Sequence, residues 1–225
     1  MRNYSAFDIL GPVMIGPSSS HTAGAARLGK VAKLIAGKDI KEVKFLLHGS
    51  FAKTYKGHGT DRALVAGILG MDPWDERLKD SLDIAKKLNL KVAFVEADLG
   101  EEHPNTVKFI IKDCEDKVIE VMGSSIGGGN IIISEVDGQK IKFTGEYPTL
   151  IIKHVDVPGV ISKVTAVIYE AQINIATMSV FRSSRGAEAT MIFETDSLVS
   201  ENLVEKISEI GNIKGIRVIS TISER

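Results

Sequence analysis

The chain has 225 residues, which is enough for one large domain or two ordinary ones. Its 28 basic and 29 acidic side chains leave a formal net charge of -1, which lacks the strong basic excess typical of nucleic-acid-binding proteins. No apolar run approaches the roughly 20 residues that cross a bilayer, and MRNYSAFDIL lacks the apolar core of a signal peptide, so we expect a cytoplasmic protein that binds neither nucleic acid nor membrane.

The predicted elements begin with a helix over residues 23–36 that ends at Gly37. The strand VKFLLHG follows it. The run DRALVAGILG then predicts a short helix, which we expect Thr60 or Asp61 to cap and Gly70 to end.

A longer helix is predicted from Asp72, because the proline that follows it, Pro73, suits the first helical position. The strands KVAFVEA, TVKFIIKD and KVIEVMG come next, and a hairpin turns at Asp137-Gly138. This mixture of helices and strands predicts an α+β domain.

A boundary between domains is predicted in the stretch TGEYPTL, where glycine and proline interrupt the pattern. We place one domain over residues 1–146 and a second over 148–225. In the second, the strand TLIIKHVDV ends at Pro158-Gly159, and a helix, two strands, another helix and a last strand follow. This β-α-β-β-α-β order is the ferredoxin-like arrangement.

The second helix of this domain has recognisable ends. Ser200 is expected to cap its start, and Gly211 to take the C′ position directly after its C-cap.

Four polar, glycine-rich stretches are candidate functional sites: GPSSSHTAG, KTYKGHGTDRA, EEHPNT and SSIGGGN. The first two lie at predicted helix starts, where free backbone N–H groups and the helix dipole favour a carboxylate or phosphate. Each also carries a histidine, His21 or His58, which suits proton transfer near neutral pH. A small anion that needs proton chemistry would fit between them.

Ordinary structural explanations compete with this one. Serine-rich turns before helices are usually N-caps, and taken alone Ser18 to Ser20 favour that explanation. His58 favours function, because Gly-His-Gly has little packing value, whereas GGG also suits a bulge or tight turn. We interpret His48 and His154 as structural and Cys114 as an ordinary partly buried thiol.

The motifs IGPSSSHTAGAARLG, YKGHGTDRALVAGILG, HPNT and GGG, in this order, resemble the β chain of the bacterial iron–sulfur L-serine dehydratase, also called L-serine ammonia-lyase. The C-terminal part resembles an ACT domain in its element order and in DVPGVI and INIATM. The N-terminal part is also similar to the allosteric substrate-binding domain of some phosphoglycerate dehydrogenases.

The resemblance implies deamination of L-serine to pyruvate and ammonia with a [4Fe-4S] cluster and without pyridoxal phosphate, in amino-acid degradation and gluconeogenesis. Three cysteines hold that cluster in the family. Because Cys114 is the single cysteine here, the cluster is expected on a separate α subunit, with no metal site in this chain. The chain is then a subunit that is inactive alone.

The resemblance also implies roles for individual residues. His21 and His58 are the candidate catalytic groups, and which of them is the base stays open, as does a base on the α subunit. The candidate substrate-binding residues are Ser18, Ser20, Thr22, Thr60, Asp61, Asn105 and Gly128.

For the ACT domain, we expect self-association and an effector site formed by Asp156, Gly159 and Asn174, with a plain dimerisation platform as the alternative. The alternative for the whole chain is a regulatory module that binds an amino acid or anion and catalyses nothing.

Overall fold

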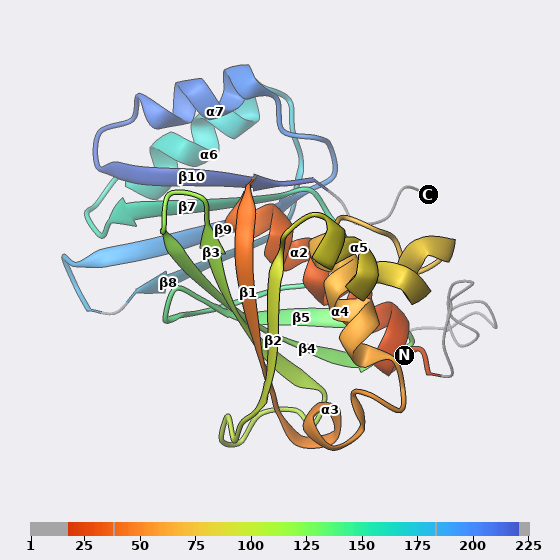
Figure 1. Ribbon diagram of the computed structural model, residues 1–225. Helices are drawn as coiled ribbons and strands as arrows, with labels where there is room; N and C mark the ends of the chain where they lie inside the picture. Colours follow the sequence, from red (N-terminus) through yellow and green to blue (C-terminus); the bar gives the residue numbers. More distant parts are fainter. Residues whose placement is uncertain (1–17, 38, 183, 221–225) are drawn as a thin grey trace. The chain divides into compact units, whose positions relative to one another are not determined.

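A computed structural model describes residues 18–37, 39–182 and 184–220, and the chain divides into two compact units, Met1–Gly138 and Gln139–Arg225 (Figure 1). The predicted domain boundary lies a few residues further on, within TGEYPTL, and it stays a prediction.

The first unit is built on a mixed sheet with the strand order β2-β1-β3-β4-β5-β6, of which β6 already belongs to the second unit's range. Strand β1 pairs in parallel with β2 and antiparallel with β3, and β3, β4 and β5 continue antiparallel. Phe45 and Phe109 are register partners, both fully buried, with ring centroids 5.4 Å apart. The strands are β1 Ile40–Leu47, β2 Lys91–Glu96, β3 Thr106–Asp113, β4 Val118–Gly127, β5 Asn130–Val136 and β6 Gln139–Phe143.

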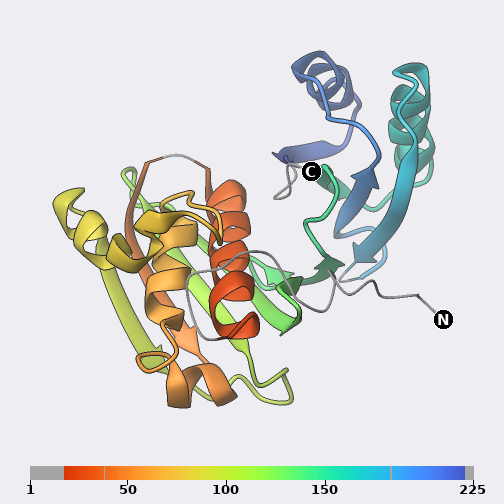
Figure 2. The same cartoon turned by 90° about the vertical axis from the view of Figure 1, so that its right-hand side faces the viewer.

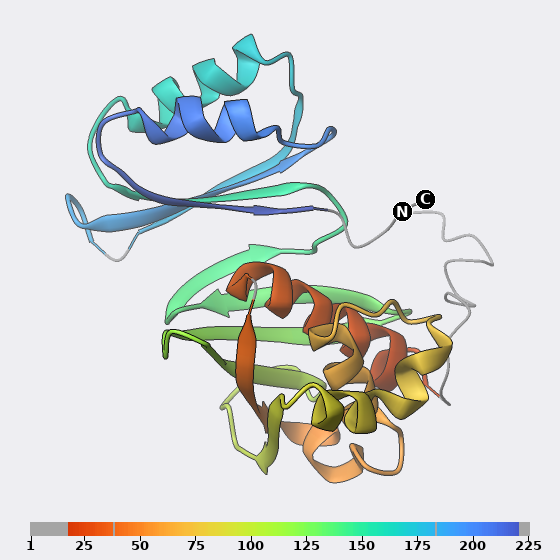
Figure 3. The ribbon, with the colours of Figure 1, turned by 45° about the horizontal axis from the view of Figure 1, so that its top comes forward.

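Helices cover one face of this sheet (Figure 3). Helices α2 and α4 cross where Gly29 faces Gly67, and a Cβ atom on Gly67 would lie 2.7 Å from the Gly29 Cα atom. This close approach holds together two helices that follow the candidate histidines in the chain: His21 precedes α2 and His58 precedes α4. The helices are η1 Ser20–Gly24, α2 Ala25–Ala36, α3 Gly49–Thr54, α4 Thr60–Ile68, η2 Glu76–Asp80 and α5 Ser81–Lys87.

Two local predictions in this unit are wrong. The helix after Gly59 is capped by neither Thr60 nor Asp61, because Gly59 itself is the N-cap, with φ of 70°. Asp72 does not start the next helix. Asp75 does, by accepting a hydrogen bond from the Arg77 N–H, and the segment opens as a 3-10 turn.

The serine-rich stretch does not form the ordinary N-cap that it favours when taken alone. Ser20–Gly24 is a π-helical turn that leads into α2, and no side-chain hydrogen bond caps it. Helix α2 begins at Ala25, two residues later than predicted, and Gly37, with φ of 93°, ends it as expected.

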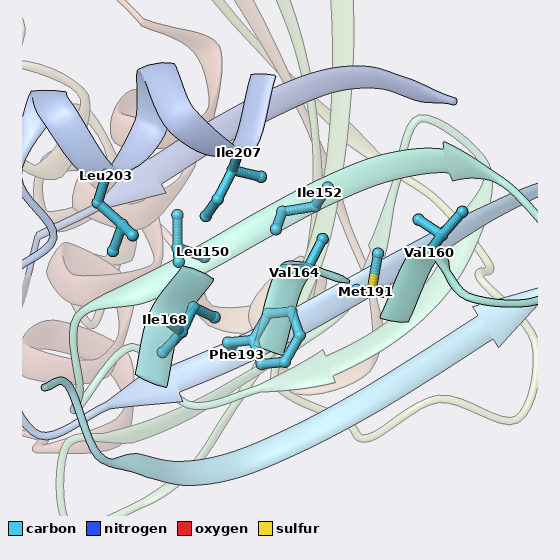
Figure 4. Close-up of a cluster of buried hydrophobic side chains, with 9 residues drawn as sticks. All are labelled: Leu150, Ile152, Val160, Val164, Ile168, Met191, Phe193, Leu203 and Ile207. Atoms are coloured by element: carbon cyan, nitrogen blue, oxygen red, sulfur yellow. The ribbon is translucent and has the colours of Figure 1, made fainter. Parts of the chain in front are cut away.

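The second unit has the predicted β-α-β-β-α-β order, folded as an antiparallel sheet with the strand order β10-β7-β9-β8 (Figure 2). Both helices pack on one face of that sheet and enclose a core that includes Leu150, Val164 and Phe193 (Figure 4). The elements are β7 Thr149–Val155, α6 Val160–Glu170, β8 Ile175–Arg182, β9 Glu188–Thr195, α7 Glu201–Ser208 and β10 Ile213–Ile219.

Ser200 caps α7 as predicted, since its hydroxyl accepts a hydrogen bond from the Leu203 N–H at 3.3 Å. The prediction for Gly211 is wrong. The left-handed residue after α7 is Asn212, with φ of 73°, because asparagine tolerates this conformation better than other side chains do.

Candidate functional site

His21 is a buried side chain in the turn η1, with 8% of its surface exposed. Both of its ring nitrogens meet serine hydroxyls: Ser18 Oγ lies 3.2 Å from Nδ1, and Ser50 Oγ lies 3.1 Å from Nε2. Burial lowers the pKa of His21 from its ordinary value of 6.5, and the charge of His58 lowers it further. The imidazole is therefore neutral at neutral pH.

The ring of His58 lies edge-on to that of His21, with centroids 4.8 Å apart and an interplanar angle of 84°. His58 follows α3, and its backbone N–H donates to the Thr54 carbonyl at 3.0 Å. Its Nδ1 atom is buried and has no hydrogen-bond partner among the described residues. One imidazole of the pair is thus fully engaged, and the other has a free nitrogen.

Three buried hydroxyls around this pair are also without a partner in the described part of the chain: those of Thr22, Thr60 and Ser125. Thr22 follows His21, Thr60 begins α4, and Ser125 lies against η1, where a Cβ atom on Gly24 would be 2.8 Å from the Ser125 Cβ atom. Buried polar groups are nearly always hydrogen-bonded, and leaving one unpaired costs about 1–3 kcal/mol. Such a group of unpaired polar atoms is typical of a binding site for a polar ligand.

The HPNT segment builds the site through its backbone. The Pro104 carbonyl accepts hydrogen bonds from the N–H groups of Ser50, at 2.7 Å, and Phe51, at 3.3 Å. The Asn105 carbonyl accepts one from the Ser125 N–H at 3.0 Å. This loop therefore ties the start of α3 and the end of β4 to one place.

Asp61 is half-buried in the first turn of α4, and its carboxylate accepts a hydrogen bond from the Arg62 N–H at 2.8 Å. Burial raises the pKa of Asp61, and the Arg62 N–H and the nearby positive charges oppose that rise. A buried carboxylate in this state gains from a cationic partner.

The remaining predicted residues lie beside this group. Ser20 is half-buried at the start of η1. Gly128 lies in the turn between β4 and β5, where the carbonyl of its neighbour Gly129 accepts a hydrogen bond from Arg27 at 2.9 Å. Sequence reasoning missed Ser50 and Ser125, because a single serine after a strand or within one has no pattern of its own.

The predicted effector residues of the second unit do not come together within one chain. Asp156 and Gly159 follow β7, and the Asp156 carboxylate pairs with Arg182 at 3.2 Å. Asn174 precedes β8 at the opposite end of the sheet, where its amide donates to Asp196 at 2.6 Å. His154 is buried in β7, and its Nε2 atom has no partner among the described residues.

No group of three or more His, Cys, Asp or Glu side chains that could hold a metal ion occurs in residues 18–37, 39–182 and 184–220. Cys114 is exposed, so its prediction as a partly buried thiol is wrong. None of the described helices is long and apolar enough to span a membrane.

Residues 5–136 match the family model "Serine dehydratase beta chain", and residues 148–212 match "ACT domain". The chain belongs to the serine dehydratase beta chain family. Its similarity to a probable L-serine dehydratase beta chain of Bacillus subtilis is 42% identity over 213 residues, covering 95% of this chain and 96% of that protein. The L-serine dehydratase beta chain of Peptoniphilus asaccharolyticus is 43% identical over 208 residues, covering 92% and 94%.

The chain is also similar to a D-3-phosphoglycerate dehydrogenase of Methanocaldococcus jannaschii, at 34% identity over 203 residues. That match covers 87% of this chain and 37% of the dehydrogenase. The expected family and the α+β fold with a C-terminal ACT domain are confirmed.

Proposed function

We propose that the chain is the β subunit of an L-serine dehydratase, which deaminates L-serine to pyruvate and ammonia together with an α subunit. The proposal rests on the pair formed by the buried His21 and the partly buried His58, whose ring centroids are 4.8 Å apart, and on nearby hydroxyls that have no partner among the described residues. The similarity to two L-serine dehydratase beta chains over nearly their whole length supports it.

The free hydroxyls suit the substrate carboxylate. Thr22, Thr60 and Ser125 each have a hydroxyl proton to donate, and a carboxylate accepts several such bonds. The Asp61 carboxylate suits the substrate ammonium, because a charge-assisted hydrogen bond would offset the cost of its burial. Ser18, Ser20, Asn105 and Gly128 complete the proposed substrate site, and Ser18 and Asn105 act through His21 and the backbone of Ser125.

The free nitrogen of His58 suits proton transfer. We assign removal of the α proton of L-serine to His58 Nδ1, which is buried and has no hydrogen-bond partner in the described part of the chain. The β hydroxyl leaves as water after gaining one proton, and aminoacrylate remains. Its tautomer, an imine, takes up one water and yields pyruvate and ammonia, so the atoms of serine are conserved. His21, neutral and bonded at both nitrogens, holds the geometry of this step.

The described residues do not fit an iron–sulfur cluster. Cys114, the single cysteine, is exposed in the turn after β3, and no candidate group of metal ligands occurs in the part of the chain that the structure describes. We therefore propose that the α subunit supplies all ligands of a [4Fe-4S] cluster and that this chain contributes the substrate-binding and proton-transfer groups. A protein of this kind has no need of pyridoxal phosphate.

The ACT domain is proposed to be regulatory. Its predicted effector residues lie at opposite ends of one sheet, so an effector site made of all three needs a second copy of the chain. This agrees with the expected self-association. Asp156 is also engaged with Arg182, which an effector would have to displace.

The test is an anaerobic assay of pyruvate formation from L-serine. The chain is measured alone, then with the cysteine-bearing α subunit and a reconstituted cluster. Activity only in the second mixture supports the proposal, and activity of this chain alone contradicts it, because one cysteine cannot hold the cluster. No activity in either mixture, together with saturable binding of L-serine to this chain, would favour a regulatory binding module.

A further inference from the structure

Ser50 is a side chain that neither the motifs nor the proposed substrate site includes, yet it contacts the most buried titratable group of the site. It lies second in α3, directly after Gly49, and is half-buried. Its Oγ atom is 3.1 Å from His21 Nε2. Its backbone N–H donates to the Pro104 carbonyl at 2.7 Å, so the HPNT loop fixes its position.

The hydrogen bonds around Ser18 indicate which nitrogen of His21 carries the proton. Ser18 Oγ accepts a hydrogen bond from the backbone N–H of His21 at 3.4 Å. That bond uses one lone pair of the Ser18 oxygen and leaves its hydroxyl proton free to donate to another acceptor. The nearest acceptor for that proton is Nδ1, 3.2 Å away, and this donation makes Nδ1 the nitrogen with the lone pair.

We infer that Ser50 is a positioning residue that holds His21 in the tautomer protonated at Nε2, by accepting that proton in a hydrogen bond. Since a neutral imidazole has one N–H, donation by Ser18 to Nδ1 leaves Nε2–H as the donor to Ser50. With its acceptor role used, the Ser50 hydroxyl keeps its own proton for a further acceptor in the site.

In the proposed mechanism the two histidines therefore have different roles: His21 holds the geometry and His58 transfers the proton. Ser18 and Ser50 occupy both nitrogens of His21, so its ring cannot rotate without losing two hydrogen bonds. The ring of His58 rests edge-on against it, and its orientation is fixed in turn. The expected effect of Ser50 on turnover rests on the proposed function. The tautomer itself is a property of the free chain.

The test measures the nitrogen shifts of the His21 side chain by long-range ¹⁵N–¹H NMR in the full chain at neutral pH. We expect the wild type to show a protonated Nε2 and an unprotonated Nδ1, and Ser50→Ala to lose this single-tautomer pattern. Ser50→Thr keeps the hydroxyl and should restore it. Lys53→Ala, an exposed change on the same helix, is the control and should leave the His21 signals unchanged.

A wild-type His21 protonated at Nδ1 would overturn the inference, and so would Ser50→Ala with unchanged His21 shifts. In the complex with the α subunit, Ser50→Ala should lower kcat on the order of 10²-fold, as misplacement of a reacting group does, and Ser50→Thr should recover most of it. If no variant and no wild type turns over L-serine, the proposed function fails, while the NMR result still decides the role of Ser50.

Discussion

Gly29 of α2 and Gly67 of α4 lie against each other with no room for a side chain on either. A Cβ atom on Gly67 would be 2.7 Å from both the Gly29 Cα atom and the Lys30 nitrogen. Both of these are backbone atoms, which cannot move aside as the end of a flexible side chain can. Helix α2 continues from the turn that holds His21, and α4 begins two residues after His58. The contact therefore holds together the two helices that follow the candidate histidines.

Gly67→Ala should push the helices apart and lower the free energy of unfolding by about 1–3 kcal/mol, the usual cost of overpacking a core. Urea denaturation of the full chain would measure it. Gly57→Ala is the matched control, because the atom nearest to its added Cβ is 3.8 Å away. Equal stability of Gly67→Ala and wild type would show that the helices can separate at no cost.

His58→Ala should lower kcat of the complex with the α subunit by about 10²–10⁴-fold, the range for loss of a general acid or base. Its unfolding free energy should stay close to that of the wild type, because the side chain is only partly buried. Pyruvate formation from L-serine provides the measurement, with exposed Lys53→Ala as the control. Near-normal turnover would remove His58 from the mechanism.

The lowered pKa of His21 predicts a loss of stability in acid. The unfolded His21 titrates near 6.5 and the folded one below it, because burial and His58 disfavour the charged ring. Between these two values the unfolded chain binds more protons. The contribution of His21 to the free energy of unfolding is thus fully present above pH 6.5, and it is lost as the pH drops toward the folded pKa.

Urea denaturation at about pH 7.5 and about pH 5.5 would test this, with His21→Gln expected to show a smaller difference between the two than the wild type. The control is His103→Gln, a change of an exposed loop histidine. The same acid sensitivity in His21→Gln and wild type would assign the effect to other groups.

The raised pKa of Asp61 makes stability depend on pH in the opposite direction. Burial makes its charged form unfavourable in the folded chain, so the stability that protonation provides is lost as the pH rises through the folded pKa. At neutral pH, Asp61→Asn should raise the melting temperature, since Asn can still accept the Arg62 N–H bond. It should also raise KM for L-serine roughly 10- to 100-fold, because hydrogen bonds to charged groups contribute about 1.5–3 kcal/mol.

A thermal melt of the chain and a saturation curve of the complex measure these two effects. Asp83→Asn, on the exposed side of α5, should change neither. A lower melting temperature for Asp61→Asn would mean that the carboxylate stabilises the fold, contrary to the direction of its pKa.

Gly159→Leu should impair the ACT domain and spare the chemistry. Gly159 has φ of 90°, and a Cβ atom there meets nothing within 4 Å, so strain and not collision is the cost, about 1–2 kcal/mol. We expect retained turnover with altered dimerisation or effector response, measured by sedimentation and by serine saturation. Lost turnover in an intact complex would contradict the proposed separation of roles between the domains.

The sequence predicted best what short-range patterns control. The order of elements in the ACT domain, the cap at Ser200 and the end of α2 at Gly37 depend on neighbours in the chain, and all are as expected. Thr60 shows the limit. A hydroxyl before a helical pattern predicts a cap, but Gly59 takes the left-handed conformation and caps α4 instead. That leaves the Thr60 hydroxyl buried and free for another use.

Ser50 and Ser125 could not be found from sequence, because their importance comes from contacts across the fold. Ser50 is 29 positions from His21, its partner. Ser125 reaches the site through the pairing of β4 with its neighbours and through the space left by Gly24. Distances of this kind follow from the packing of helix on sheet, which no local pattern contains.

The exposed thiol of Cys114 gives this chain a single chemical handle. It lies just past the end of β3, whose first residue is Thr106, so about 25 Å of strand separates it from the HPNT loop. A maleimide dye would attach at one position without touching either imidazole. The fluorescence polarisation of that dye would then report binding of the α subunit directly, in an otherwise unmodified protein.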